Sequence, residues 1–306
     1  MAYDAGKVPD LMPIASIIIP AYNRQRSLKA AIKSALQQSI RDIEVIVVDD
    51  GSRDRTAVVA EHCASEDRRV RLVRHETNRG AQAARNSGAR AACSPWLTFL
   101  DSDDILLKKS VELRLGVATT EGAEVVHSDC YVLRKESPQQ VFGVPNLYGS
   151  IYRELLANPG PMFQGMLISA RSFEAIGGLD ERVVAYQEWD TAIRLAKICS
   201  FGFVTEPTFI YDCTGDDTIS KNFLSAARGY EYIVHKHFME IIRNLGPKSI
   251  SLHCGAIAAH YSQAGDLTTA RKFKLRSFMW WPSPRRASAQ LRSSLLKLSS
   301  DKAHLF

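Results

Sequence analysis

Two aspartates separated by one residue, Asp101 and Asp103, directly follow the apolar run Trp96–Leu100. Carboxylate oxygens are hard ligands of the kind that Mg²⁺ and Mn²⁺ prefer. A divalent cation held by such a pair can bridge the phosphates of a nucleotide and offset the charge of a departing diphosphate. Aspartate-rich turns also occur widely because they satisfy backbone donors, so the pair indicates a site only together with other residues.

Polar residues end two other apolar runs in the same way. The run Ala15–Ile19 leads into Tyr22 and Asn23, and the run Ile43–Val48 leads through a first aspartate into Asp50. Both runs are rich in β-branched residues and stop at turn residues, which is typical of buried parallel strands. Because ligands of parallel sheets bind at the carboxyl ends of the strands, three polar strand ends on one edge predict a nucleotide site.

Alternating helices and strands have to position these polar residues. Ser27 is expected to cap a helix whose apolar residues recur at helical spacing from Leu28 to Leu36. Repeated strand–helix–strand units predict a mostly parallel sheet with right-handed crossovers. The expected strands are Val70–Arg74, Glu124–Ser128, Met166–Ser169 and Phe203–Ile210, the last interrupted by Pro207, and the expected helices are Thr56–Ala64, Ala81–Ala92 and Asp190–Ile198.

Four short motifs, in this order and at these spacings, resemble family 2 glycosyltransferases. They are the sequences IIIPAYN at Ile17–Asn23, VVDDGS at Val47–Ser52, NRG with ARNSG at Asn78–Gly88, and FLDSDD at Phe99–Asp104. The resemblance covers residues 14–215 and implies the GT-A fold, a Rossmann-like α/β domain with a mostly parallel central sheet flanked by helices. It also implies an inverting transfer of a sugar from a nucleotide-sugar donor.

The same resemblance assigns the donor-binding residues. It implies nucleotide contacts from Pro20, Tyr22, Asn23, Asp50, Arg79, Arg85, Asp101 and Ser102, and a bound Mn²⁺ or Mg²⁺ at Asp103 and Asp101. Tyr22 would stack on a pyrimidine base and Asp50 would accept a hydrogen bond from its ring N–H. Taken without the family, the alternative for Tyr22 is an aromatic at the rim of the site and the alternative for Asp50 is a turn residue that caps the next helix. Arg79 and Arg85 are each equally interpreted as surface cations.

The catalytic base that the resemblance implies is Glu188, six residues before Arg194. Inversion needs one group to accept the proton of the acceptor hydroxyl, and a single carboxylate suffices. Asp190 is the alternative base, but two residues further along a helix its side chain points roughly 200° away. Its other role is a negative charge near the amino end of a helix.

Two positions depart from the family pattern. Gln187 stands where a second acid is usual, and Thr214 stands where relatives often carry a histidine. These departures leave open a catalytically inactive scaffold that binds a nucleotide sugar or a glycan. A nucleotidyltransferase is a third interpretation, although only Arg24 and Arg26 stand where its Gly- and Arg-rich phosphate loop would be needed.

Three parts are expected along the chain. They are a leader at residues 1–13, the GT-A domain at 14–220, and a helical extension with a basic tail at 221–306. Within the domain we expect a nucleotide-binding half at 14–104 and an acceptor half at 105–220. The predicted function is transfer from a nucleotide-sugar donor, expected to be a UDP-sugar, to a hydroxyl of a glycan or lipid-linked acceptor in polysaccharide or glycoconjugate synthesis.

Composition and charge point to a globular protein of a reducing compartment. Hydrophobic residues make up 45% and charged residues 24% of the 306, which excludes a disordered chain. The six cysteines form no CxxC pair, and no apolar stretch is long enough to span a bilayer. We therefore expect a cytoplasmic protein, at the inner face of the membrane if it contacts one, with no nucleic-acid partner.

The membrane contact is expected from the tail. Between Arg271 and Lys302 there are nine Lys or Arg residues and one acid, and Trp280 and Trp281 precede a basic pair. Tryptophan beside basic residues suits a membrane interface. Packing of both tryptophans into the helical extension is the equal alternative.

Overall fold

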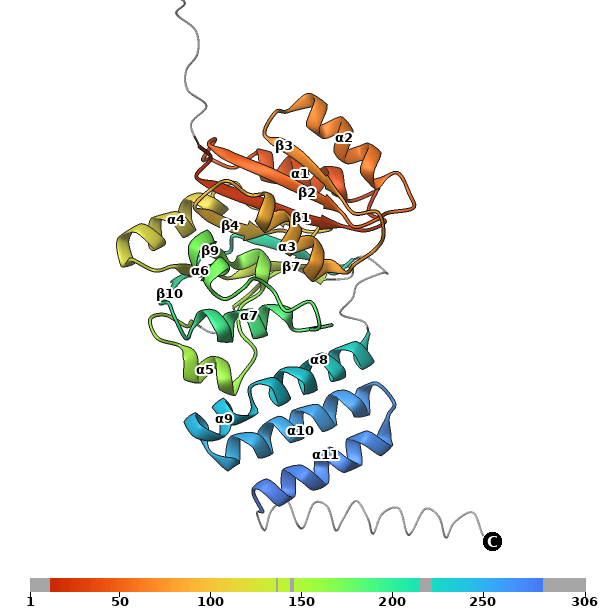
Figure 1. Ribbon diagram of the computed structural model, residues 1–306, viewed down its shortest axis with the longest axis vertical. Coiled ribbons are helices and arrows are strands. Elements are labelled where there is room, and N and C mark those ends of the chain that lie inside the picture. Colours follow the sequence, from red (N-terminus) through yellow and green to blue (C-terminus); the bar gives the residue numbers. More distant parts are fainter. Residues whose placement is uncertain (1–11, 136, 144–145, 215–221, 283–306) are drawn as a thin grey trace, which may run out of the picture. The chain divides into compact units, whose positions relative to one another are not determined.

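The computed structural model describes residues 12–135, 137–143, 146–214 and 222–282 (Figure 1). Most of the expected leader, the 220/221 domain boundary and the tail beyond residue 282 lie outside these ranges. The contacts divide the described chain into two units. An α/β unit contains residues 12–183 and 187–214, and a helical unit contains 184–186 and 222–282.

A seven-stranded sheet forms the centre of the α/β unit (Figure 1). Its order is β10-β6-β9-β4-β1-β2-β3, and every neighbouring pair is parallel except that β9 runs antiparallel to both β4 and β6. The strands are β1 Ala15–Ala21, β2 Ile43–Asp49, β3 Val70–Arg74, β4 Trp96–Phe99, β6 Val125–Ser128, β9 Leu167–Ser169 and β10 Phe201–Val204. The expected mostly parallel sheet is confirmed.

Helices cover both faces of this sheet because successive strand side chains point to opposite sides. Ile17 and Ile19 of β1 lie in one apolar core with residues of α1 (Leu28–Leu36), α2 (Thr56–Glu66) and α4 (Ser110–Glu121). Ile18 faces α3 (Ala81–Ala91) on the other side. A Cβ at Gly88 of α3 would lie 2.4 Å from Ile18 Cγ2, so only glycine allows this close approach.

A smaller four-stranded sheet has the order β5-β11-β7-β8. Its strands are β5 Ile105–Leu106, β7 Cys130–Arg134, β8 Ser137–Phe142 and β11 Phe209–Asp212. The remaining helices of the unit are α5 Tyr152–Ala157, the short 3₁₀ helix η1 Phe163–Gly165, α6 Ala170–Ala175 and α7 Gln187–Leu195.

Two local predictions were wrong. The expected strand Phe203–Ile210 is two strands in different sheets, because Pro207 lacks an N–H and restricts the residue before it. Ser27 precedes α1 as expected, but its side chain makes no capping hydrogen bond. Its backbone is already helical, so only its carbonyl serves the helix, accepting from Ala30 and Ala31.

The carboxyl-terminal region is helical, as predicted. It contains α8 Phe223–Lys236, α9 Phe238–Leu245, α10 Pro247–Gln263 and α11 Leu267–Trp280. Helices α10 and α11 pair closely, since the hydroxyls of Ser251 and Ser277 each donate to the other residue's carbonyl at 2.6 and 2.7 Å. None of the helices in the described part of the chain is long and apolar enough to cross a membrane.

Candidate active site

The carboxyl ends of β1, β2 and β4 adjoin in the sheet, so the predicted polar residues lie along one edge. Pro20 is buried within β1 and pairs with Val48 of β2. On its other side β4 ends at Phe99, opposite Ile18. The nitrogen of Pro20, which cannot donate a hydrogen bond, therefore lies beyond the last residue pair of β1 and β4, where the pairing requires no donor.

Asn23 joins the turns that follow β1 and β2. Its backbone N–H donates to Ser52 Oγ at 2.9 Å, and its side-chain oxygen accepts from the N–H of Arg53 at 2.9 Å. Asn23 has φ 54°, a left-handed conformation that asparagine tolerates better than most residues. Tyr22, just before it, keeps 38% of its surface exposed, so its ring is free to meet a ligand.

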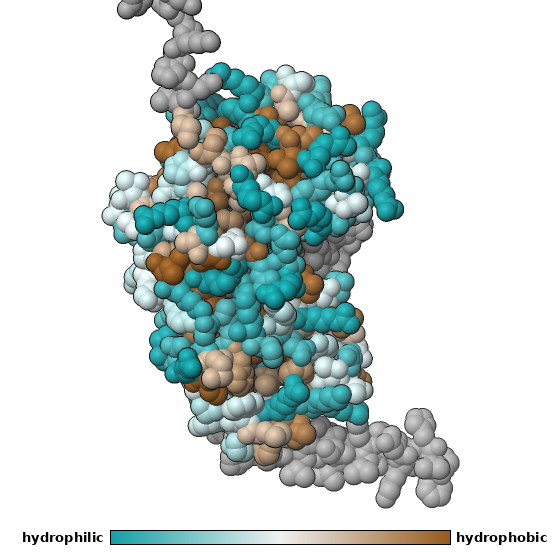
Figure 2. Space-filling model, in the orientation of Figure 1, coloured by the Kyte–Doolittle hydropathy of each residue, from teal (hydrophilic) through white to brown (hydrophobic). Residues whose placement is uncertain are grey.

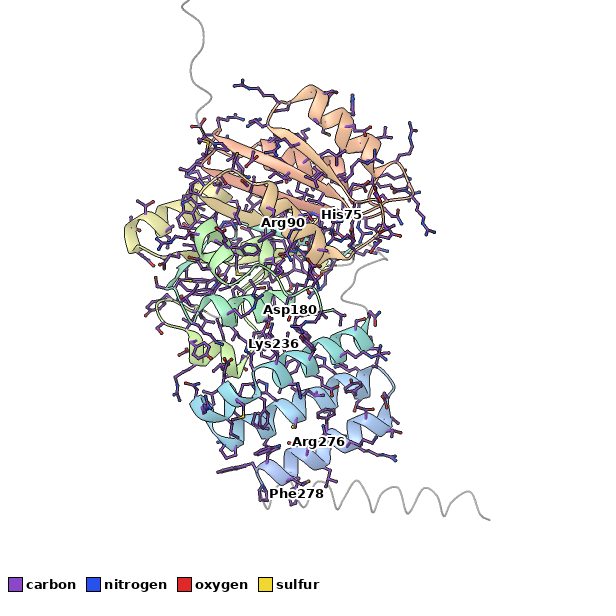
Figure 3. The ribbon with its side chains drawn as sticks, viewed as in Figure 1. His75, Arg90, Asp180, Lys236, Arg276 and Phe278 are labelled. Carbon is purple, nitrogen blue, oxygen red and sulfur yellow. The ribbon has the colours of Figure 1, made fainter. Side chains whose placement is uncertain are left out.

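Asp50 is buried and holds the turn that leads into α3. Its carboxylate accepts hydrogen bonds from the N–H groups of Arg79 and Gly80 at 2.9 and 2.7 Å. His75 Nδ1 lies 2.7 Å from the same carboxylate, and His75 Nε2 lies 2.9 Å from Ser87 Oγ on α3. Figure 3 shows His75 in the turn after β3. Asp50 thus fixes the turn before α3 in addition to any contact with a base.

Arg85 of α3 is buried and points at the Asp-x-Asp pair. Its Nη2 donates to Asp101 Oδ1 at 2.5 Å, and its guanidinium carbon lies 5.1 Å from the ring centre of Phe163. Its Nε and Nη1 have no hydrogen-bond partner among the described residues. A buried cation with two unused donors suits an additional anionic ligand such as a phosphate.

Gln164 of η1 links two aspartates of the same turn. Its Nε2 donates to Asp101 Oδ2 at 2.8 Å and to Asp104 Oδ2 at 2.6 Å. Its backbone carbonyl accepts a hydrogen bond from the guanidinium of Arg114, which also donates to Thr98. Arg114 is fully buried, and burial lowers its pKa to about 9. The turn carrying the two candidate metal ligands is therefore held from a segment 60 residues away in sequence.

Asp103 is the less constrained of the pair. It is partly exposed, and its Oδ2 lies 3.6 Å from Nη2 of Arg24. Burial raises the pKa of Asp103, and the negative charge of Asp101 raises it further. Ser102, between them, is buried. The local excess of negative charge is one that a divalent cation would relieve, so the two carboxylates fit such an ion.

The ion would need ligands beyond these two carboxylates. No group of three or more His, Cys, Asp or Glu side chains that could hold a metal occurs in the described ranges. Mg²⁺ commonly binds through one or two carboxylates and completes its shell with waters and substrate phosphates. The donor set therefore matches a cation that binds together with a nucleotide diphosphate.

Glu188 lies in the first turn of α7, where it interacts electrostatically with this charged group. Burial raises the pKa of its carboxyl, Arg85 lowers it and Asp101 raises it, which places Glu188 within electrostatic reach of both. Its side chain is still partly exposed. A carboxylate beside the candidate diphosphate site, with its pKa moved toward neutrality, is suited to accept a proton.

Asp190, the alternative base, points elsewhere. Its buried carboxylate lies 2.9 Å from Nε of Arg194 one turn later. The same arginine donates to the carbonyls of Ile176 and Gly178 at 2.9 and 2.6 Å. Asp190 therefore anchors α7 to the preceding turn, and the geometry favours Glu188 of the two.

The other predicted residues differ in how closely they approach. Arg79 is exposed, and its guanidinium lies 4.0 Å from the carboxylate of Glu181. At the end of β11 the N–H of Asp212 donates to Asp104 at 2.9 Å, and the N–H of Thr214 donates to Asp212 at 2.8 Å. The place of the usual family histidine is thus taken by residues that brace the aspartate turn.

Comparison with known proteins identifies the fold and the family. The Glycosyl transferase family 2 model matches residues 16–170. An uncharacterized glycosyltransferase of Haemophilus influenzae is 31% identical over 241 residues, covering 74% of this chain and 78% of that one.

Two solved structures share the fold. TarS of S. aureus in complex with UDP-GlcNAc superposes with TM-score 0.61 at 14% identity, covering 85% of this chain and 90% of that one. The mannosyltransferase PcManGT of Pyrobaculum calidifontis, in complex with GDP-Man and Mn²⁺, gives 0.59 at 18% identity, covering 97% and 84%. The fold is therefore the expected GT-A fold, and the chain is a glycosyltransferase that belongs to family 2.

Proposed function

We propose that the protein is an inverting, metal-dependent glycosyltransferase that moves a sugar from a UDP-sugar to a hydroxyl of a glycan or lipid-linked acceptor. The observation that carries this proposal is the hydrogen bond from the buried Arg85 to Asp101, together with the electrostatic influence of both groups on Glu188. One carboxylate can accept a proton where another carboxylate and a buried cation can receive a diphosphate.

The donor would be bound in two parts. The exposed ring of Tyr22 would stack on the base, and Pro20, Asn23 and Asp50 would lie beside the nucleoside. The unused Nε and Nη1 of Arg85 would donate to the diphosphate. Asp101 and Asp103 would hold Mn²⁺ or Mg²⁺, which supplies Lewis-acid stabilisation of the leaving diphosphate when bound.

Glu188 would act on the acceptor. As the acceptor hydroxyl oxygen forms its bond to the anomeric carbon, its proton passes to a carboxylate oxygen of Glu188. The bond between the anomeric carbon and the diphosphate oxygen breaks on the opposite face, and the diphosphate leaves with the electron pair. Attack from the face opposite the leaving group inverts the configuration. Arg85 offsets the developing negative charge.

The test is UDP release from a panel of UDP-sugars, each with Mn²⁺ and with a chelator. We expect one donor to support metal-dependent turnover that accelerates when a glycan or lipid-linked acceptor is added. Metal-dependent UDP binding without turnover would instead favour a nucleotide-binding scaffold. Pyrophosphate formation from UTP and a sugar phosphate would favour a nucleotidyltransferase.

Gln164 gives a test of how the aspartate turn is held. Gln164→Leu removes both hydrogen bonds to Asp101 and Asp104, and burial already raises the pKa of Asp104 well above its usual value. We expect a loss of about 2–3 kcal/mol in the free energy of unfolding, measured in urea. Turnover should fall about 10- to 100-fold, as for other residues that orient metal ligands. The exposed Gln37→Leu should change neither, and equal effects from both variants would contradict this role.

We further propose that the protein works at the inner face of a membrane and touches it through the end of α11. Leu275, Met279, Trp280 and Trp281 are exposed there, beside exposed basic residues such as Lys274. Apolar atoms are visible over the end of this unit in Figure 2, and Figure 3 labels Arg276 and Phe278 in the last turns of α11. All six cysteines are free, which suits a reducing compartment.

This contact predicts binding to anionic vesicles. Met279 and Trp281 are 71% and 44% exposed, so changing both to serine should leave the fold intact. Co-sedimentation with vesicles of phosphatidylserine and phosphatidylcholine should weaken at least about tenfold, because two apolar side chains no longer enter the interface. Val58→Ser, at a 49% exposed position of α2, is the control. Unchanged co-sedimentation of the double variant would rule the contact out.

A further inference from the structure

The segment Val184–Tyr186 immediately precedes α7, which carries the candidate base, yet it packs within the helical unit. The next residue, Gln187, already belongs to the α/β unit and begins α7. Glu188 is therefore only two residues along the chain from Tyr186. The backbone of Tyr186 leads directly into the first turn of α7.

A glycine of α8 lets this segment approach closely. A Cβ at Gly229 would lie 2.5 Å from the carbonyl oxygen of Ala185 and 2.9 Å from its backbone N. A side-chain Cβ essentially never makes non-bonded contacts this short, and two of the crowded atoms belong to the backbone, so a larger residue must push the segment away. The backbone of Ala185 therefore packs directly against Gly229 of α8.

The side chain of Tyr186 is held by aromatic residues of the same unit. Its hydroxyl lies 3.3 Å from Nε2 of His260 on α10, and its ring meets Tyr230 edge to face with centroids 5.6 Å apart. Tyr230 is in turn 3.1 Å from Nδ1 of His253. Edge-to-face packing and hydrogen bonds at both ends give this cluster a defined geometry.

The backbone of Tyr186 is held in an unfavourable conformation. Its φ is 59°, in the left-handed region that bulky residues rarely adopt. Such a conformation costs free energy and persists only where the surrounding contacts determine it. Here those contacts include Tyr230 and His260 for Tyr186 itself and Gly229 for the preceding Ala185, and the strained residue is two positions from the candidate base.

We propose that Tyr186, anchored in the helical unit, is a positioning residue for Glu188. The inference rests on the proposed function, because it concerns the carboxylate that the proposed function takes as the base. Catalytic geometry is demanding, and a displacement of 1 Å can cost about 10²-fold in rate. Loosening the anchor should therefore lower turnover while leaving donor binding, which uses residues of other segments, unchanged.

Two glycine variants of the full-length protein test the anchor. Gly229→Ala should displace Ala185, whereas Gly255→Ala in α10 meets nothing nearer than Ser277 Oγ at 3.8 Å. Both changes favour helix equally, so they are matched. We expect amide hydrogen exchange of the peptide spanning residues 184–190 to rise at least about tenfold in Gly229→Ala only. Unchanged exchange there would overturn the anchor, and this readout needs no substrate.

Kinetics test the consequence for Glu188. In Gly229→Ala we expect kcat to fall at least about tenfold while KM for the donor stays within about twofold. Tyr186→Ala should behave likewise, although it keeps the backbone strain, and Tyr186→Phe should recover most of kcat because the ring contacts remain. Faster exchange with unchanged kcat, or a rise in donor KM alone, would overturn the positioning role. Absence of any turnover in the wild type would refute the proposed function instead.

Discussion

Replacement of Glu188 by glutamine is expected to lower kcat about 10²- to 10⁴-fold, the usual contribution of a general base. Glutamine has the size of glutamate but cannot accept the acceptor proton. Donor KM and UDP affinity should change little, because the carboxylate acts on the acceptor hydroxyl. Initial rates with saturating donor and acceptor, together with UDP binding by calorimetry, measure both quantities.

The pH dependence gives a second readout of the same residue. Burial raises the pKa of Glu188, so the base becomes active only above the usual carboxyl range of about 4.3. The rate of the wild type should therefore rise with pH through an apparent pKa above that value. The residual activity of Glu188→Gln should lack this step.

Stability separates loss of chemistry from loss of fold. Because the pKa of Glu188 is higher in the folded chain than in the unfolded chain, its ionisation destabilises the fold as pH rises past about 4.3. Glu188→Gln should therefore melt no lower than the wild type at pH 7. The exposed Glu174→Gln in α6 is the control. Full activity in Glu188→Gln would rule out Glu188 as the base. If Asp190→Asn instead showed the loss of kcat expected for Glu188→Gln, the base would be Asp190.

Asp103→Asn is expected to lower kcat/KM about 10²- to 10³-fold, a loss typical of removing one group that stabilises developing charge. The amide is a poorer ligand for a hard cation than the carboxylate is. The Mn²⁺ concentration for half-maximal rate should rise, and a metal titration at fixed donor measures this shift.

The fold should tolerate the change at Asp103. Burial and the charge of Asp101 raise the pKa of Asp103, so the ionised form is disfavoured and a neutral amide relieves the repulsion. Asp67→Asn is the matched control. It breaks the ion pair between Asp67 and Arg69, which lies far from Asp103 in the sequence. A metal dependence identical to that of the wild type would remove Asp103 from the proposed cation site.

The sequence predicted the strands and helices of residues 14–104 well because its signals there are local. The runs that became β1 and β2 are apolar and β-branched, and their ends extend by only one or two residues beyond prediction. Parallel strands bring their carboxyl ends to one edge whatever their sequence separation. The proximity of Asp103 to Arg24 in the turn after β1, at 3.6 Å, followed from that topology alone.

Contacts made across the fold could not be predicted. Nothing near Gln164 in sequence marks it as the residue that bridges Asp101 and Asp104, because its role depends on where η1 packs. His75 had a usable signal, since it follows β3 at the same sheet edge as the other polar residues. The splitting of Phe203–Ile210 was signalled by Pro207, but the choice of sheet for each half was not.

The hydrogen bonds by which Asn23 joins the turns after β1 and β2 have a consequence for the affinity of a bound donor. Since Asn23, Ser52 and Asp50 already join the turns around the pocket, those turns need no reordering when a nucleotide arrives. Ordering loops on binding consumes affinity, so a pre-assembled rim leaves more of the contact energy to the complex. Removing the Asn23 hydrogen bonds would then lower the affinity for the nucleotide through entropy, with no ligand contact removed.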